Sequence, residues 1–206
     1  MLSAGDDLVS ISVANPREAQ DLATRLRESL AFLEVVAGID SVVVQFDIAS
    51  KDRNDIEQQI AEIVAQPGNT HTISHALVEI PVCYGGVAGP DLADVCEQLR
   101  ISQEQFIALH SGREYEVDLV GFTPGFAYIG GLDEQLNVPR LQEPRVCVPA
   151  GSVGITGGMT GLYALQGPGG WPLIGRTSFT LFDVDAGDPF VLVAGSRVVF
   201  VAVDSM

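Results

Sequence analysis

Three arginines and a dense run of glycines mark the most unusual part of this sequence. Residues 121–182 contain thirteen of the 22 glycines and six of the 11 prolines. In this block Arg140, Arg145 and Arg176 balance three acidic residues, whereas the rest of the chain carries the whole formal charge of −16. A planar guanidinium can donate two charge-assisted hydrogen bonds to a carboxylate or a phosphate. We therefore predict that the three arginines converge on a pocket for a small anionic ligand.

A second interpretation stays open for Arg140 and Arg145. Each follows a proline, and each could form a surface ion pair with Glu143, Asp133 or Glu134. Such exposed pairs contribute only roughly 0–1 kcal/mol to stability. The residue types alone do not separate an anion site from surface pairing.

Two further motifs in the block could line a binding site. Gly169 and Gly170 precede Trp171 in QGPGGWPLIGRT, and successive backbone N–H groups in such a turn can hold an anion beside an aromatic wall. The motif lacks the spacing and the lysine of a nucleotide phosphate loop. Phe122 and Phe126 flank a Thr-Pro-Gly turn in GFTPGFAYIGGL. The alternative for all five residues is structural, as turn glycines and buried aromatic rings.

His110 is the candidate for proton transfer, because it is the single histidine after residue 80. An imidazole titrates near neutral pH and can act as a general acid or base. Its alternative role is electrostatic, since it ends a predicted helix, where a positive charge is favourable. We predict no metal site, because the three cysteines form no C-x-x-C pair. We also predict no serine nucleophile, because no G-x-S-x-G motif is present.

The order of periodic segments predicts an α+β protein with two domains. Residues 1–80 follow the order β-α-β-β-α-β, with a last strand at 76–82, which is the split βαβ or ferredoxin-like arrangement. Residues 81–206 begin with two short helices and continue as short strands between glycine and proline turns. These strands, which include 178–184 and 189–194, are typical of a β-barrel.

Composition excludes several classes of function. A pI near 4.3 disfavours nucleic acid as a partner, because phosphate neutralisation needs a basic face. No apolar run is long enough for a membrane span, and the first residues do not form a secretion signal. We therefore expect a cytoplasmic protein without membrane or nucleic-acid partners.

A resemblance to a known family rests on four motifs together with His110. The motifs are CYGGVAGPDL, GFTPGFAYIGGL, VPRLQEPRVCVPAGSVGITGGMTGLY and GPGGWPLIGRT. In order and spacing they resemble the family of allophanate hydrolase subunit 1, also called the B-type subunit of 5-oxoprolinase, which includes the sporulation-kinase inhibitor of Bacillus type. The resemblance implies a cyclophilin-like barrel at residues 81–206. Ala164 and Gly167 depart from the proline and serine that are usual in this family.

The resemblance implies one component of an ATP-dependent 5-oxoprolinase, a hydrolase that opens the lactam of 5-oxo-L-proline to L-glutamate. The expected partners are a homologous cyclophilin-like component, of the allophanate hydrolase subunit 2 or C-type 5-oxoprolinase kind, and a third 5-oxoprolinase component. We expect a heteromer that uses ATP and a chain that is inactive alone. In it His110 would move a proton, while the arginines would hold anions.

Two other functions stay open at this point. The chain could be a binding module that inhibits a histidine kinase, as the sporulation-kinase inhibitor does. It could also be half of a urea carboxylase or allophanate-type carboxyltransferase. That role needs a biotin carrier, and the surroundings of Lys51 do not resemble a biotin-attachment motif.

Overall fold

The computed structural model describes residues 2–3, 5–66 and 76–205 of the chain. Contacts divide the chain into two compact units, residues 1–73 and 74–206. Each unit has a hydrophobic core of its own.

The first unit is a four-stranded antiparallel sheet with two helices. Its elements are β1 (Leu2–Ser3), β2 (Leu8–Ser12), α1 (Pro16–Glu28), β3 (Glu34–Ala37), β4 (Ser41–Gln45) and α2 (Arg53–Ala65). The strand order is β1-β2-β4-β3. Alternate strand residues share one buried cluster with the inward faces of α1 and α2, so both helices cover the same face of the sheet. Asn15 and Asp52 cap the two helices with their side chains.

The prediction that residues 76–82 complete this first sheet is wrong. A split βαβ unit would pair that strand with β2, but the partner of β2 at this edge is the N-terminal strand β1. The segment instead forms β5 (Leu77–Tyr84), which pairs with two strands of the second unit. Its apolar alternation fits either sheet, so local pattern could not assign it.

The second unit is a closed seven-stranded barrel with two helices. Its elements are β5, α3 (Leu92–Leu99), α4 (Gln103–Ser111), β6 (Glu114–Val120), β7 (Ala127–Ile129), η1 (Glu134–Leu136), β8 (Arg145–Val148), β9 (Ser152–Thr156), β10 (Met159–Leu162), β11 (Gly167–Gly169), β12 (Leu173–Arg176) and β13 (Arg197–Ala202). The barrel order is β10-β7-β6-β13-β5-β12-β9, and β9 pairs with β10 to close it. Strands β8 and β11 form a separate two-stranded ribbon. The predicted α+β class with a β-barrel is confirmed.

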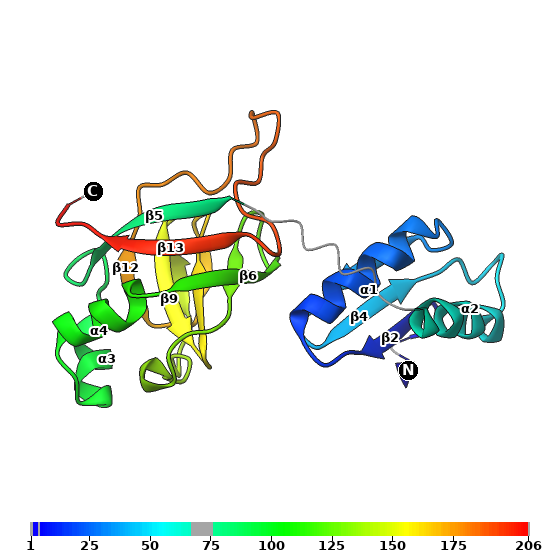
Figure 1. Cartoon of the computed structure of the whole chain (residues 1–206), viewed down its shortest axis with the longest axis horizontal. Helices are drawn as coiled ribbons and strands as arrows, with labels where there is room; N and C mark the ends of the chain where they lie inside the picture. The colour runs from blue at the N-terminus through cyan, green and yellow to red at the C-terminus, as the bar shows by residue number, and fades with distance from the viewer. Residues whose placement is uncertain (1, 4, 67–75, 206) are drawn as a thin grey trace. The chain divides into compact units, whose positions relative to one another are not determined.

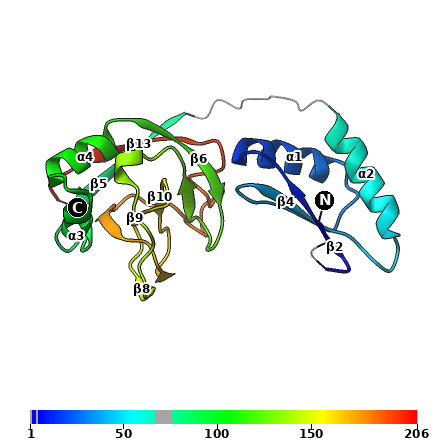
Figure 2. The ribbon, with the colours of Figure 1, turned by 90° about the horizontal axis from the view of Figure 1, so that it is seen from below.

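Strand β13 lies between β5 and β6, parallel to the first and antiparallel to the second (Figure 1). Helices α3 and α4 lie side by side against the barrel, and Figure 2 shows β8 at the opposite border of the barrel from α4. Leu92 and Phe106 from these helices join the core cluster of Ile80 and Phe200. Ser102 begins α4 with a complete capping box.

The two strands predicted at 178–184 and 189–194 do not form. These segments share one isolated bridge, between Phe182 and Phe190, and anchor themselves to the core through Leu181 and Leu192. Seven other strands already close the barrel, so no free edge is left for them to extend. Within the described residues, no helix is long and apolar enough to cross a membrane.

Replacement of Phe200 tests how strongly the barrel depends on β13. Phe200 is fully buried, and its ring centroid lies 5.4 Å from that of Tyr115 on β6. We expect Phe200→Ala to lower the free energy of unfolding of the barrel by about 3–5 kcal/mol, because a large cavity replaces the ring. Urea unfolding followed by the fluorescence of Trp171, the single tryptophan, measures this value for the barrel. Val201→Ala is the matched control, since that side chain points outward and is 39% exposed; an equal loss in both variants would contradict the expectation.

Candidate functional site

Six of the nine predicted site residues meet in one pocket of about 290 Å³. We call it the aromatic pocket. Its lining residues are Phe122, Phe126, Tyr128, Arg140, Leu141, Pro144, Tyr163, Pro168, Gly169, Gly170 and Trp171. Segments from β7, β11, the end of β10 and the loop before β8 therefore contribute to one surface.

Phe126 is the centre from which the aromatic pocket is built. Its ring makes edge-to-face contacts with Tyr128, Tyr163 and Trp171, at centroid distances of 4.7, 4.8 and 5.7 Å. Phe126, Tyr163 and Trp171 are all buried. Edge-to-face contacts fix each ring relative to the next. The cluster therefore forms a rigid floor, and the packing interpretation applies to Phe126.

Phe122, in contrast, stands at the rim and is 63% exposed. Its φ of 69° is unusual for a bulky side chain. Two hydrogen bonds close the loop around it, from the Gly121 amide to the Phe126 carbonyl and from the Phe126 amide to the Thr123 carbonyl, both at 3.0 Å. Strain of this kind is stable only where the surroundings fix the conformation. The loop therefore presents an aromatic face to solvent beside the pocket.

Two glycines allow the backbone to pass close to the aromatic rings of the floor. A Cβ on Gly161 would lie 2.6 Å from the Trp171 ring and 2.9 Å from the Phe126 ring. A Cβ on Gly169 would lie 2.5 Å from the Tyr163 hydroxyl oxygen. Gly169 is thus required by packing against Tyr163, which is a structural reason for part of the glycine motif. Position 167 differs, because a Cβ there would meet open space.

Arg140 is the cation that lines the aromatic pocket. It is exposed, and its guanidinium has no hydrogen-bond partner in the described part of the chain. Burial raises the pKa of both Tyr128 and Tyr163, although the positive charge of Arg140 opposes the rise. Both phenols therefore stay protonated at neutral pH. The Tyr128 hydroxyl also has no partner among the described residues, so it can donate to a ligand.

Arg145 does not line the pocket, although β8 carries it opposite Gly169. Its Nη2 donates to Asp91 Oδ1 at 2.6 Å, while Asp91 Oδ2 accepts from the Leu173 amide at 2.6 Å. Its Nη1 is buried and has no partner among the described residues. Arg145 therefore forms an ion pair, as the second interpretation expected. Its partner, however, is Asp91 and not Glu143, Asp133 or Glu134.

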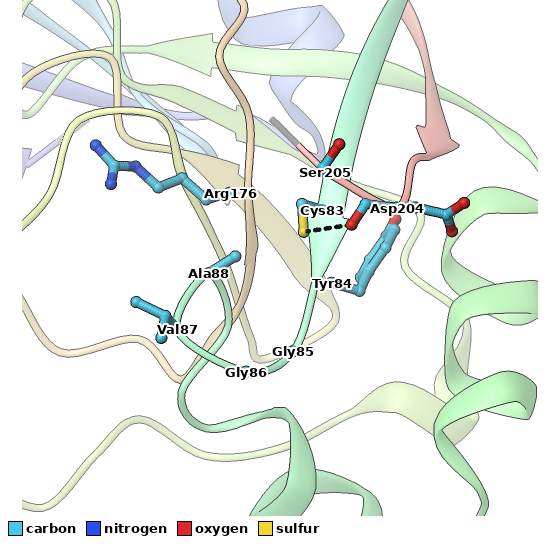
Figure 3. Close-up of a pocket in the computed structure, with 9 residues that line it drawn as sticks. All are labelled: Cys83, Tyr84, Gly85, Gly86, Val87, Ala88, Arg176, Asp204 and Ser205. Atoms are coloured by element: carbon cyan, nitrogen blue, oxygen red, sulfur yellow. Dashed lines mark hydrogen bonds between the residues drawn. The ribbon is translucent and has the colours of Figure 1, made fainter.

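Arg176 lies in a different pocket, so the predicted convergence of all three arginines is wrong. This loop pocket, of about 440 Å³, is lined by Cys83, Tyr84, Gly85, Gly86, Val87, Ala88, Arg176, Asp204 and Ser205 (Figure 3). Strand β12 places Arg176 directly opposite Cys83 on β5. Arg140 and Arg176 therefore line two different pockets, and different segments of the chain hold them.

His110 is fully buried in the barrel unit and lines neither pocket. Its Nδ1 accepts from the Tyr84 hydroxyl at 2.7 Å, and its Nε2 lies 3.0 Å from Thr160 Oγ1. Since the Thr160 hydroxyl donates to the Gly154 carbonyl, it accepts the proton of Nε2. Burial lowers the pKa of His110 to about 3. This geometry describes a neutral, saturated core residue, and it lends no support to the predicted role in proton transfer.

Sequence reasoning missed Tyr128, Tyr163 and Asp91. Tyr128 follows Phe126 by two residues, and this period of two places both side chains on one face of a strand. That signal could have been used. Asp91 and Arg145 are 54 residues apart, and no local pattern connects them. Among the described residues, no cluster of three or more His, Cys, Asp or Glu side chains could hold a metal ion.

Comparison with known proteins places this chain in a family. Residues 2–192 match the family model for the carboxyltransferase domain, subdomain C and D. The chain is 41% identical to the B subunit of 5-oxoprolinase from Escherichia coli O157:H7, over 93% of this chain and 87% of the relative. It is 37% identical to the B subunit of 5-oxoprolinase from Bacillus subtilis, over 84% of this chain and 76% of the relative. The chain therefore belongs to the carboxyltransferase-domain class and, within it, to the family of 5-oxoprolinase B subunits.

Solved structures show the same fold in one chain of similar length and in chains that are much longer. A conserved uncharacterized protein from Pyrococcus horikoshii is 36% identical, with a TM-score of 0.61, and the match covers 98% of this chain and 96% of that one. The structure of TTHA0988 is 30% identical, with a TM-score of 0.81, and the match covers 97% of this chain but 40% of that one. The Kluyveromyces lactis urea carboxylase shares the fold at 16% identity, with a TM-score of 0.78 over 98% of this chain and 21% of that one.

The buried histidine predicts a loss of stability in mild acid. In the unfolded chain His110 binds a proton as the pH falls through about 6.5, whereas in the folded barrel its pKa of about 3 keeps it neutral. Its contribution is therefore complete above pH 6.5 and decreases as the pH falls below that value. Between pH 7 and pH 5 we expect the barrel to lose about 2 kcal/mol of unfolding free energy from this group. His110→Gln should lack this part of the loss in urea unfolding at the two pH values; equal pH dependence in both proteins contradicts the assignment.

Removal of the Asp91 charge should destabilise the barrel more than removal of an exposed acid. Asp91→Asn weakens two hydrogen bonds and leaves Arg145 without its anion, so we expect a loss of about 2 kcal/mol. Glu114→Gln breaks the exposed pair with Arg197 and should cost less than about 1 kcal/mol. Trp171 fluorescence during urea unfolding compares the two variants. The role of Asp91 is disproved by a loss no larger than that of Glu114→Gln.

Proposed function

We propose that this chain is the B-type subunit of an ATP-dependent 5-oxoprolinase and that its aromatic pocket binds the lactam acid. The names of its relatives support the reaction class. The observation that carries the proposal is the convergence of aromatic faces with one unpaired cation, Arg140, in a single small pocket.

The pocket matches the chemistry of 5-oxoproline in two ways. The ligand is a small, nearly flat five-membered ring with one carboxylate. Phe122 and Trp171 offer aromatic surface to the ring, and the Arg140 guanidinium can hold the carboxylate by two parallel hydrogen bonds. The volume of about 290 Å³ is sufficient for a ligand of this size.

Tyr128 is the residue that we assign to the lactam oxygen. Its phenol lines the pocket, stays protonated because burial raises its pKa, and has no acceptor in the described part of the chain. A hydrogen bond to the carbonyl oxygen would stabilise negative charge that develops there during ring opening. His110 has no part in this arrangement, because its two ring nitrogens are already bonded in the core.

ATP use belongs to the assembled enzyme in this proposal. A triphosphate is normally held by a glycine-rich loop with lysine or by several cations, and the aromatic pocket contains only one cation. We therefore propose that the ATP site lies outside this pocket, in an assembly with the homologous component and a third component. The curated relatives are named as B subunits, which supports further components beside this chain. We place this heteromer in the cytoplasm.

The other two functions receive less support. No relative reported above carries the name of a kinase inhibitor. The urea carboxylase likeness, at 16% identity, concerns the fold alone.

Reconstitution tests the proposed reaction. We expect the purified chain to release no phosphate from ATP, whereas the chain with its homologous partner and the third component should do so only when 5-oxoproline is added. In the complex, Arg140→Gln should raise the KM for 5-oxoproline by roughly tenfold or more, because a charged hydrogen-bonding partner is lost. Tyr128→Phe should mainly lower kcat, since its bond strengthens as charge develops.

Arg100→Gln is the charge-matched control, because Arg100 is exposed and lines neither pocket. It should leave KM and kcat unchanged. Phosphate release by the chain alone, or an Arg140 variant that behaves like the Arg100 variant, would reject the proposed site.

A further inference from the structure

The loop pocket is not used by the proposed function, and its walls carry unpaired donors. The loop that follows β5 forms one wall, and Arg176 on β12 forms another (Figure 3). The pocket encloses about 440 Å³.

The loop is held in one conformation by three backbone hydrogen bonds. The amides of Gly85, Gly89 and Asp91 donate to the carbonyls of Ile174, Gly85 and Leu173, at 3.1, 2.8 and 3.0 Å. Gly85 and Gly86 have φ values of 69° and 54°, which glycine adopts without strain. The hydrogen bonds of the chain itself therefore fix the conformation of the loop.

Three successive amides of this loop have no acceptor in the described part of the chain. They belong to Gly86, Val87 and Ala88, which all line the pocket. Consecutive amides in a turn with left-handed residues can form a concave site for an anion. The Val87 side chain is fully exposed, so solvent reaches this part of the loop.

Arg176 is oriented but not neutralised. Its Nε donates to the Ala150 carbonyl at 2.9 Å, while its two terminal nitrogens have no partner among the described residues. The acid in the lining is Asp204, whose backbone carbonyl accepts from the Cys83 thiol at 3.9 Å. In Figure 3 the Asp204 carboxylate and the Arg176 guanidinium extend in opposite directions.

We propose that the loop pocket is a second anion site of this chain and that it binds a phosphoryl group. A tetrahedral oxyanion offers several oxygen atoms at once, so it can accept from backbone amides and from a guanidinium together. A carboxylate has only two oxygen atoms and would satisfy fewer of these donors. The inference does not depend on the reaction proposed above.

Titration of the isolated chain with inorganic phosphate tests the site. In ¹H–¹⁵N NMR spectra we expect saturable shifts of the Gly86, Val87 and Ala88 amides and of the Arg176 Nε–H signal. Acetate at the same ionic strength should bind at least roughly tenfold more weakly, because it satisfies fewer donors. Arg176→Gln should weaken phosphate binding by roughly tenfold, because a charged donor is removed. Asp204→Asn should strengthen binding, since it removes a negative charge from the lining.

Val87→Glu is a second variant that should leave the fold intact, because this side chain is fully exposed and supports no packing. It should abolish phosphate binding by repulsion, while Val87→Gln should retain it. The site is refuted by shifts that do not saturate, by equal binding of acetate, by shifts confined to the aromatic pocket, or by a Val87→Glu protein that binds phosphate normally. Since neither the partner proteins nor 5-oxoproline are present, this failure is distinct from a failure of the proposed reaction.

Discussion

The Asp91 carboxylate is the interaction on which the arrangement of both pockets depends. One oxygen accepts from the Leu173 amide of β12, and the other accepts from Arg145 of β8. Asp91 follows the loop of the loop pocket, whereas β8 pairs with β11, which carries Gly169 into the aromatic pocket. A single, mostly buried acid therefore joins the loop after β5 to the ribbon beside the aromatic floor. A charged pair of this kind fixes geometry more than it adds stability, because desolvation offsets much of the attraction.

Charge is distributed unevenly between the interior and the pockets. Among the buried polar residues, His110 is kept neutral by burial, which lowers its pKa, and both of its ring nitrogens are hydrogen-bonded, to Tyr84 and Thr160. Arg140 and Arg176, whose terminal nitrogens have no partner among the described residues, line the two pockets instead. In the two sites that we propose, each of them would face a negative ligand, in a chain whose formal charge is −16. Such local positive sites can attract small anions that the rest of the surface repels.

The features that could be predicted well from the sequence are those with local causes. Helix starts at Asn15, Asp52 and Ser102 follow from capping chemistry, and the aromatic and glycine residues around Phe122 and Gly169 do meet in one pocket. The errors all concern long-range pairing. The strand at 76–82 could join either sheet by its pattern, and the burial of His110 depends on residues from β5 and β10. The separation of Arg140 from Arg176 depends in the same way on which strands the barrel makes neighbours.

The position of β13 between β5 and β6 has a consequence for biosynthesis. The strands of the first unit all leave the ribosome before β5, so that sheet can assemble during translation. The barrel, however, stays open until β13 has emerged, because its two neighbours cannot pair with each other across the gap. Until then the nascent chain exposes two unpaired sheet edges, which are natural substrates for aggregation or chaperone capture.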